Sequence, residues 1–144
     1  LYLMYAEALN EFSGPSTEVY DALNQIRDRA GIPSVQEAWS NTAYAATPNK
    51  HTSQDGLREI IQQERMIELA FEGHRYYDIR RWKLAEKYFT TPIKGWSVDE
   101  DSEANYYQIM EIGQRSFNSP RDYLQPISFT ELSRNPNLIQ NPGW

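Results

Sequence analysis

Cysteine is absent from this 144-residue chain, and histidine occurs only twice. The sequence therefore has no disulfide, no thiolate metal site and no cysteine nucleophile, while the redox compartment stays open because secreted chains also lack cysteine. The longest apolar run, from Leu1 to Ala6, is far shorter than the roughly 20 residues that span a bilayer. Basic residues are outnumbered 14 to 20 by acidic ones, giving a net charge of −6, which is the wrong sign for a nucleic-acid partner.

Familiar catalytic signatures are missing as well. The chain has no Gly-x-Ser-x-Gly elbow, no phosphate-binding glycine loop and no His-Glu-x-x-His. His74 follows Glu72 at the wrong spacing for the Glu-x-x-His of diiron helices. We therefore expect structural histidines, no metal and no cofactor.

What the chain does have is ten tyrosines and four tryptophans. Aromatic side chains combine a large apolar face with a polar tip, so they serve wet concave surfaces as well as cores. The length suits a domain with a substantial core. The aromatic residues are therefore the first place to look for a binding function.

Residues 1–31 form an expected helical hairpin. The first helix has apolar residues at helical spacing, namely Leu1, Met4, Tyr5, Ala8, Leu9 and Phe12. A break at Ser13–Ser16 leads to a second stripe that ends at Gly31. The pair resembles one tetratricopeptide unit, which cannot cover its own apolar face. No N-cap precedes Leu1, so we expect the chain to begin inside a helix, as the C-terminal portion of a longer protein whose N-terminal part is missing.

The rest of the chain divides into three parts. Residues 32–53 predict a loop with room for one short helical turn. Residues 54–89 predict two helices, the first opened by a capping box at Thr52-x-x-Asp55, with Gly73 as its left-handed C-cap, and the second running from about Arg75 to Tyr88. Residues 90–144 predict an irregular third with a few short strands and a helical turn near Phe129–Leu132. The predicted fold class is mainly α.

Glu64, Glu68 and Glu72 recur every four residues and share one helix face. One interpretation is a catalytic pair, because retaining glycosidases use two carboxyl groups about 5 Å apart. The other interpretation, which we favour, is ion pairing with nearby arginines, the candidates being Arg65, Arg75, Arg80 and Arg81. The acidic run Asp99–Glu103 also has two interpretations. We favour a solvated loop over a weak cation site, because the run lacks the ligand pattern of an EF-hand.

Five aromatic residues lie in predicted loops, outside the helical stripes: Trp39, Tyr44, Trp96, Tyr106 and Tyr107. Such rings can stack on the C–H faces of sugars, or they can pack beneath their loops. They are the candidate ligand contacts. Trp144, at the end of the chain, is expected to dock as a plug.

The segment Glu64-Arg65-x-x-Glu68-Leu-Ala-Phe-Glu-Gly-His-Arg-Tyr-Tyr-Asp-Ile-Arg-Arg-Trp82 resembles the SusD/RagB family of glycan-binding outer-membrane lipoproteins of Bacteroidota. Three further stretches agree, and the resemblance covers residues 1–144. They are Tyr5–Asn10 with the second helix Asn24–Gly31, then Tyr123-Leu-x-Pro-Ile127, and finally the ending Asn135–Trp144.

The resemblance implies a non-catalytic protein that sits as a lid on a TonB-dependent SusC-like transporter and delivers oligosaccharides or polysaccharides to it. In the RagB branch the ligands are peptides. It also implies attachment to the outer membrane, facing the exterior, through a lipid anchor upstream of this sequence. Much of the ligand-contacting surface of the family lies upstream too.

The signature itself is expected to be architectural. Asp78 lies three residues from both Arg75 and Arg81, so its carboxylate can accept from two guanidinium groups at the junction of two helices. The residues assigned to this structural signature are Glu64, Arg65, Glu68, Glu72, Gly73, His74, Arg75, Asp78, Arg81 and Trp82.

Three hypotheses therefore remain. The first is a glycan-binding uptake component, with a peptide-binding RagB-like component as its variant. The second is a glycoside hydrolase that uses Glu64 and Glu68. The third is a helical-repeat scaffold that recognises peptides.

Overall fold

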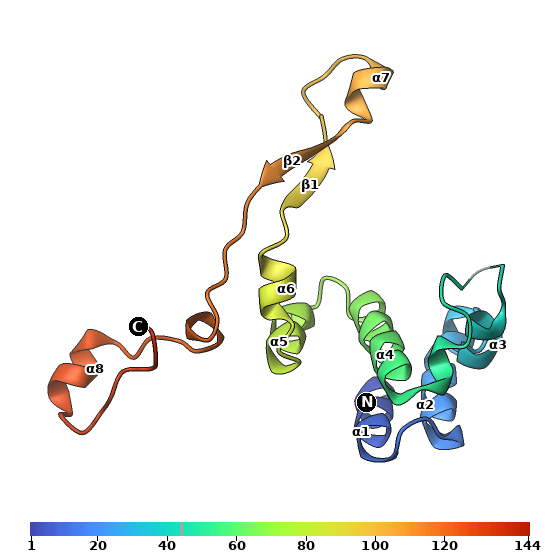
Figure 1. Ribbon diagram of the computed structural model, residues 1–144, viewed down its shortest axis with the longest axis horizontal. Coiled ribbons are helices and arrows are strands. Elements are labelled where there is room, and N and C mark those ends of the chain that lie inside the picture. Colours follow the sequence, from blue (N-terminus) through green and yellow to red (C-terminus); the bar gives the residue numbers. More distant parts are fainter. Residues whose placement is uncertain (44) are drawn as a thin grey trace. The chain divides into compact units, whose positions relative to one another are not determined.

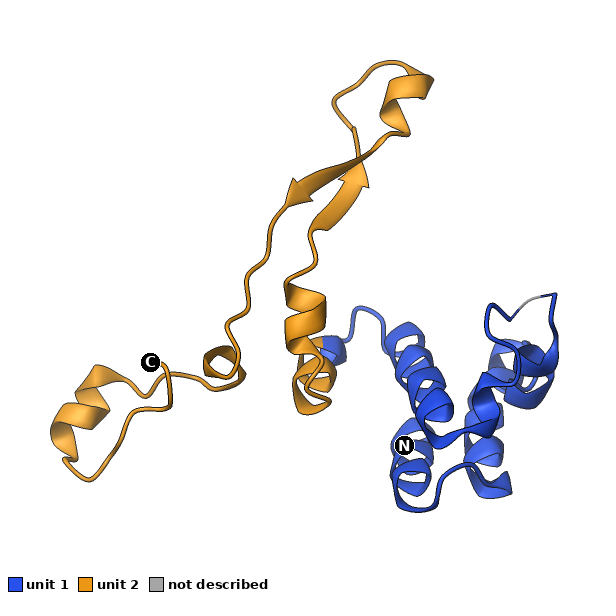
Figure 2. Ribbon diagram, in the orientation of Figure 1, with its two compact units in different colours: residues 1–75 blue, residues 76–144 orange. Residues whose placement is uncertain are grey.

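A computed structural model describes residues 1–43 and 45–144. The chain divides into two compact units, residues 1–75 and residues 76–144 (Figure 2). Unit 1 contains α1 (Tyr2–Ser13), α2 (Thr17–Ala30), α3 (Val35–Ser40), the 3-10 turn η1 (Lys50–Thr52) and α4 (Gln54–Glu68). α5 (His74–Arg81) begins at the end of unit 1. No helix in the described part of the chain has the length and hydrophobicity of a membrane-spanning segment.

Unit 2 continues with α6 (Ala85–Phe89), strands β1 (Ile93–Trp96) and β2 (Ile109–Gly113), and α7 (Glu103–Tyr106) between the strands. The 3-10 turn η2 (Arg121–Tyr123) and α8 (Phe129–Arg134) follow. Figure 1 shows the strands side by side, with α7 in their connection. The prediction of a mainly α fold with a few short strands is confirmed.

Serine side chains begin three of the helices of unit 1. The hydroxyls of Ser16, Ser34 and Ser53 each accept a hydrogen bond from the backbone N–H three residues later. Each hydroxyl satisfies a donor that the first helical turn leaves without an intrahelical partner. The N-cap of α4 is thus Ser53, and the capping box predicted at Thr52 is wrong by one residue.

The core of unit 1 is apolar and comes from four helices. Its buried members are Leu3, Ala6, Val19, Ala22, Leu23, Val35, Leu57, Ile60 and Ile61. Most of the stripe predicted on the first helix lies outside this core, because Leu1, Met4, Tyr5 and Phe12 are exposed. Leu9 is the member of the stripe that packs against the core. α1 is apolar on more than one face, and the face with Leu3 and Ala6 is the one that packs.

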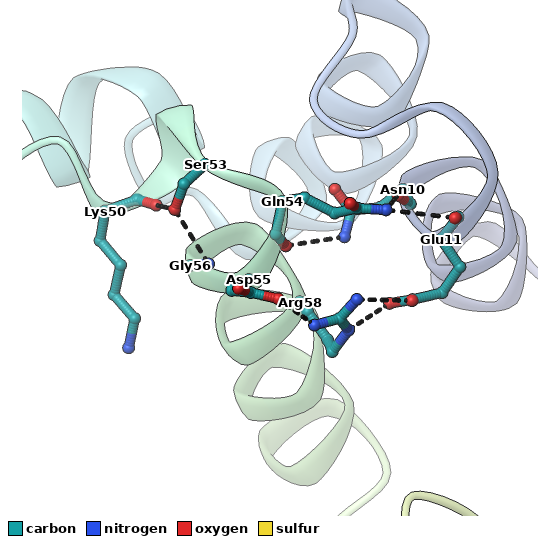
Figure 3. Close-up of polar contacts among 8 residues, drawn as sticks. All are labelled: Asn10, Glu11, Lys50, Ser53, Gln54, Asp55, Gly56 and Arg58. Carbon is teal, nitrogen blue, oxygen red and sulfur yellow. Dashed lines mark hydrogen bonds and ion pairs between the residues drawn. The ribbon is translucent and has the colours of Figure 1, made fainter.

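A polar network joins α1 to the start of α4 (Figure 3). The buried Asn10 side chain donates to the Gln54 carbonyl at 3.0 Å, and the Gln54 side chain donates back to the Asn10 carbonyl at 2.7 Å. Beside them, Arg58 donates to both carboxylate oxygens of Glu11, at 2.5 and 2.7 Å. This reciprocal pairing fixes the register of the two helices, which the apolar contacts alone do not specify.

Two stretches differ from their predictions. The predicted loop 32–53 contains α3 as well as η1. The helix predicted from Arg75 to Tyr88 is divided into α5 and α6 by Lys83, which has a φ of 58°. The Lys83 N–H bonds to the Arg80 carbonyl and the Leu84 N–H to the Ile79 carbonyl, which is the hydrogen-bond pattern of a Schellman C-cap.

Gly73 has the left-handed backbone predicted for it, with a φ of 76°. However, α4 ends at Glu68, so Gly73 is not its C-cap and instead lies directly before α5. The intervening turn contains Phe71, a fully exposed residue with a φ of 66°.

Candidate functional site

The β1–β2 hairpin brings three of the five predicted aromatic contacts together. Trp96 ends β1, Tyr106 ends α7 and Tyr107 follows it. The ring centroids are 4.9 Å apart for Trp96 and Tyr107, 5.2 Å for Tyr106 and Tyr107, and 6.0 Å for Trp96 and Tyr106. We call these three residues the hairpin cluster. The rings meet edge to face, at interplanar angles of 69° to 85°, which is a favoured aromatic geometry.

Backbone pairing places the hairpin cluster. Trp96 lies opposite Ile109 in the antiparallel ladder. The next residue, Ser97, donates its N–H to the carbonyls of both Tyr106 and Gln108, each at 3.2 Å. These bonds tie α7 to the end of β1, so residues ten positions apart in the sequence lie beside one another. The arrangement holds the rings in place without a large apolar core around them.

The hairpin cluster remains open to solvent. Trp96 is 51% exposed and Tyr107 is 55% exposed. About half of each of these two side chains is therefore accessible to a flat apolar surface, and phenol hydroxyls can donate and accept hydrogen bonds beside it. A sugar ring presents that combination of C–H face and hydroxyl rim.

Trp39 lies elsewhere, on α3 of unit 1. Its side chain is partly buried and packs against the unit 1 core. The Lys50 ammonium lies 5.5 Å from the centre of the indole ring. This position fits a packing role for Trp39, and its role as a ligand contact stays a prediction. Tyr44 lies outside the described residues.

The signature glutamates are paired with arginines of α2. Glu64 forms an ion pair with Arg27, and Glu68 forms one with Arg29. The side chains of Arg27 and Glu64 are only 10% and 14% exposed. Ion pairing was the favoured interpretation, although the sequence did not indicate these partners, which come from a helix almost 40 residues earlier.

The remaining signature residues lie in or beside α5, except Arg65, which lies on α4. Glu72 and His74 are exposed, with 3.9 Å between carboxylate and imidazole nitrogen. Asp78 is buried and accepts from the Arg81 Nε at 2.9 Å. The Arg81 guanidinium lies 4.7 Å from the centre of the Trp82 ring. Arg65 is buried at the end of α4. These contacts are of the kind expected for an architectural signature.

Unit 2 also contains a pocket of about 280 Å³ that the sequence did not indicate. It is lined by Tyr76, Arg80, Phe89, Ser116, Phe117, Asp122, Leu124, Gln125 and Trp144. The Asp122 carboxylate accepts from Arg121 and from the Asn118 N–H, which lowers the pKa of Asp122. The residues that line the pocket are spread between positions 76 and 144, so no local sequence motif indicates the pocket. The pocket is slightly smaller than typical small-molecule sites.

The C-terminal segment is fixed by side-chain amides. Gln140 donates to and accepts from the backbone of Ile127, at 3.0 and 2.9 Å. The Trp144 indole N–H donates to the Arg121 carbonyl at 3.1 Å, and the Arg121 guanidinium lies 4.8 Å from the indole ring. Trp144 therefore docks against η2, although 48% of its surface stays exposed, which is more than a buried plug would show.

No three His, Asp or Glu side chains come together as metal ligands in residues 1–43 and 45–144. The weak cation site considered for the acidic run Asp99–Glu103 therefore has no supporting geometry. The acidic side chains there are exposed to solvent.

Comparisons with known proteins agree with the sequence motifs. A model of the SusD family matches residues 1–144. SusD-like protein P2 of Formosa agariphila is 38% identical over 143 residues, which cover 99% of this chain and 24% of that protein. SusD-like protein P25 of the same species is 40% identical over 141 residues, covering 98% of this chain and 22% of that protein.

Solved structures agree in fold. A SusD-like protein from Bacteroides fragilis matches with 31% identity and a TM-score of 0.77, over 99% of this chain and 24% of that one. A SusD-like carbohydrate binding protein from the same species matches with 34% identity and a TM-score of 0.70, over 96% and 27%. The chain thus spans about a quarter of the length of these relatives. The chain belongs to the SusD family.

Proposed function

We propose that this chain is part of a glycan-binding component of an outer-membrane nutrient uptake system, and that the hairpin cluster contributes a sugar-stacking surface. The observation that carries the proposal is the group of three touching aromatic rings, two of them about half exposed, on a hairpin of a SusD-family chain. A related structure is described as a carbohydrate binding protein, which supports the same ligand class.

The proposed action is binding without bond cleavage. A glycosidase that used Glu64 and Glu68 would need one carboxyl group to donate a proton and the other to attack or activate water. In this chain both carboxylates are ion-paired with arginines of α2. This pairing supports a structural role for the two glutamates and a non-catalytic protein.

In the proposed system the whole protein is lipid-anchored at the outer membrane, faces the exterior and acts as lid and delivery partner of a TonB-dependent SusC-like transporter. The family supports this assignment. Trp39 and Tyr44 stay candidate contacts of the same ligand. A peptide-binding, RagB-like component is the alternative that the test below distinguishes.

Affinity electrophoresis of the full-length protein tests the ligand class. The gels contain a panel of polysaccharides, and a parallel titration uses peptide digests. Retardation by at least one polysaccharide, with no oligosaccharide released on prolonged incubation, is the expected result. Binding to peptides alone would favour the RagB-like alternative, and product release that is lost in Glu68→Gln would favour the hydrolase. Co-purification of the protein with a TonB-dependent barrel from solubilised membranes tests the partner.

A further inference from the structure

The hairpin that carries the aromatic cluster has charge of almost one sign. Between Ile93 and Gly113 there are five acidic side chains and one lysine, a net charge of −4. Four of the acidic residues lie in the connection from β1 into α7 and are exposed: Asp99, Glu100, Asp101 and Glu103. This connection starts directly after Ser97, whose N–H bonds to the Tyr106 carbonyl at 3.2 Å. The acidic segment therefore begins and ends in the chain next to residues of the hairpin cluster.

Basic residues are few in and beside the hairpin. Lys94 is paired with Glu111 in the register of the β-ladder, so its ammonium has a carboxylate on the neighbouring strand. Arg115 donates to the Thr91 carbonyl at 3.3 Å, and its guanidinium lies 5.9 Å from the centre of the Phe89 ring, at the base of the hairpin. Residues 95–114 contain no Lys, Arg or His. Lys94 is thus the one basic residue of the hairpin, against five acidic ones.

Sulfate and carboxylate groups on a ligand need cationic donors. Proteins bind them with guanidinium or ammonium groups, or at the N-terminus of a helix. α7 is a four-residue helix with Glu103 in its first turn, so it opposes an anion. The hairpin cluster offers indole and phenol faces together with phenol hydroxyls, which suit uncharged hydroxyl groups and C–H faces.

From this charge distribution we propose that the hairpin cluster selects uncharged glycans and rejects sulfated and uronic-acid glycans. The inference rests on the proposed function and adds the substrate class. The acidic side chains bind nothing in this scheme, because they act by setting a negative potential around the rings. One pair of like charges about 10 Å apart in water lowers affinity about twofold, so four carboxylates at about that distance from one sulfate would lower it on the order of tenfold at low salt. Salt screens the effect.

The test uses full-length protein and one polysaccharide in two forms. The neutral form is whichever of laminarin, xylan, mannan or starch binds the protein and loses affinity on Trp96→Ala. The other form is the same polysaccharide after chemical sulfation. Dissociation constants are measured at about 0.01 M and about 1 M NaCl, where the Debye length is about 30 Å and about 3 Å respectively.

Two variants carry the comparison. The first variant loses four of the five negative charges of the hairpin with little change in side-chain size, through Asp99→Asn, Glu100→Gln, Asp101→Asn and Glu103→Gln. In the matched control, four exposed acids of unit 1 are changed in the same way, namely Glu18→Gln, Asp21→Asn, Asp28→Asn and Glu37→Gln. Retained binding of the neutral polysaccharide shows that each variant is folded.

The expected result is a preference of the wild-type protein for the neutral form of about tenfold at low salt, shrinking at high salt. The hairpin variant loses most of this preference, whereas the control keeps it. Equal or tighter binding of the sulfated form by the wild-type protein overturns the inference, and so does an unchanged preference in the hairpin variant. If no polysaccharide of the panel binds, the proposed function fails instead, so the two failures are distinguishable.

Discussion

The ion pair between Arg27 and Glu64 gives the sharpest stability prediction. It joins α2 to α4, and both side chains are nearly buried. Arg27 also donates from Nε to the Pro33 carbonyl at 2.6 Å. Glu64→Gln keeps the shape of the side chain but leaves the Arg27 charge in a poorly solvated place without its counter-charge.

Removing one partner of a buried ion pair costs about 3–5 kcal/mol. The glutamine oxygen can still accept a hydrogen bond from Arg27, which returns about 1 kcal/mol. We therefore expect Glu64→Gln to lower the free energy of unfolding by about 2–4 kcal/mol. Urea denaturation followed by circular dichroism measures this loss as a lower midpoint at unchanged slope.

Glu68→Gln is the matched control, since it is the same change one helical turn later. Its partner Arg29 is 67% exposed, so the expected loss is at most about 1 kcal/mol. The double variant Arg27→Met with Glu64→Leu should recover part of the loss, because no unpaired charge remains. Equal effects of Glu64→Gln and Glu68→Gln, or no effect of the former, would show that burial does not make the Arg27–Glu64 pair the more important one for stability.

Three further perturbations probe other contacts. A Cβ at Gly56 would lie 2.0 Å from the Lys50 carbonyl oxygen, whereas one at Gly113 would lie 3.7 Å from the nearest atom. Thermal melts should therefore show that Gly56→Ala lowers the free energy of unfolding by about 2 kcal/mol and that Gly113→Ala changes it little. Burial lowers the pKa of His51, whose Nδ1 has no hydrogen-bond partner among the described residues. The unfolded chain therefore binds the proton more readily, and the free energy of unfolding should fall as the pH drops below about 6.5. The fall should be weaker in His51→Gln. A denaturation midpoint that does not change with pH would contradict this expectation. Asp78→Ala should lower the free energy of unfolding by about 2 kcal/mol, because the hydrogen bond to Arg81 is lost, and should leave glycan affinity unchanged. Lost glycan binding at an unchanged melting temperature would contradict a structural role for Asp78.

Local signals in the sequence predicted the helices best where one face alone was apolar. The stripe of α2 and the left-handed Gly31 that ends it appear as expected. In α1, apolar residues surround the helix, so periodicity could not tell which face packs. The choice depends on Asn10 and Gln54, two polar residues 44 positions apart whose reciprocal hydrogen bonds no local pattern reveals.

The break between α5 and α6 shows a different limit. Lysine rarely adopts a left-handed backbone, so nothing at Lys83 signals the end of a helix. The turn is instead closed by backbone hydrogen bonds to Ile79 and Arg80. Sequence reasoning placed Gly73 correctly in a turn because glycine favours a positive φ, yet it could not locate the end of α4 at Glu68.

For the candidate site, the sequence identified residue types but not their grouping. Trp96, Tyr106 and Tyr107 were selected because they fall outside the helical stripes, and the β1–β2 pairing then brings them together. Trp39 was selected by the same criterion but lies against the core of unit 1. Loop aromatics that pack and loop aromatics that stay open look the same in a sequence, because exposure depends on tertiary contacts.

The proposed function depends on a sugar ring stacking on the hairpin cluster. A sugar ring that covers about 60 Å² of the Trp96 indole gains about 1.5 kcal/mol, or about tenfold in affinity. The most direct measurement is isothermal titration of full-length protein with a neutral oligosaccharide that binds it, comparing wild type, Trp96→Ala and the control Tyr5→Ala, which removes an equally exposed aromatic residue from α1. We expect Trp96→Ala to raise Kd about tenfold or more and Tyr5→Ala to leave it unchanged. An unchanged Kd in a folded Trp96→Ala protein would contradict the claim.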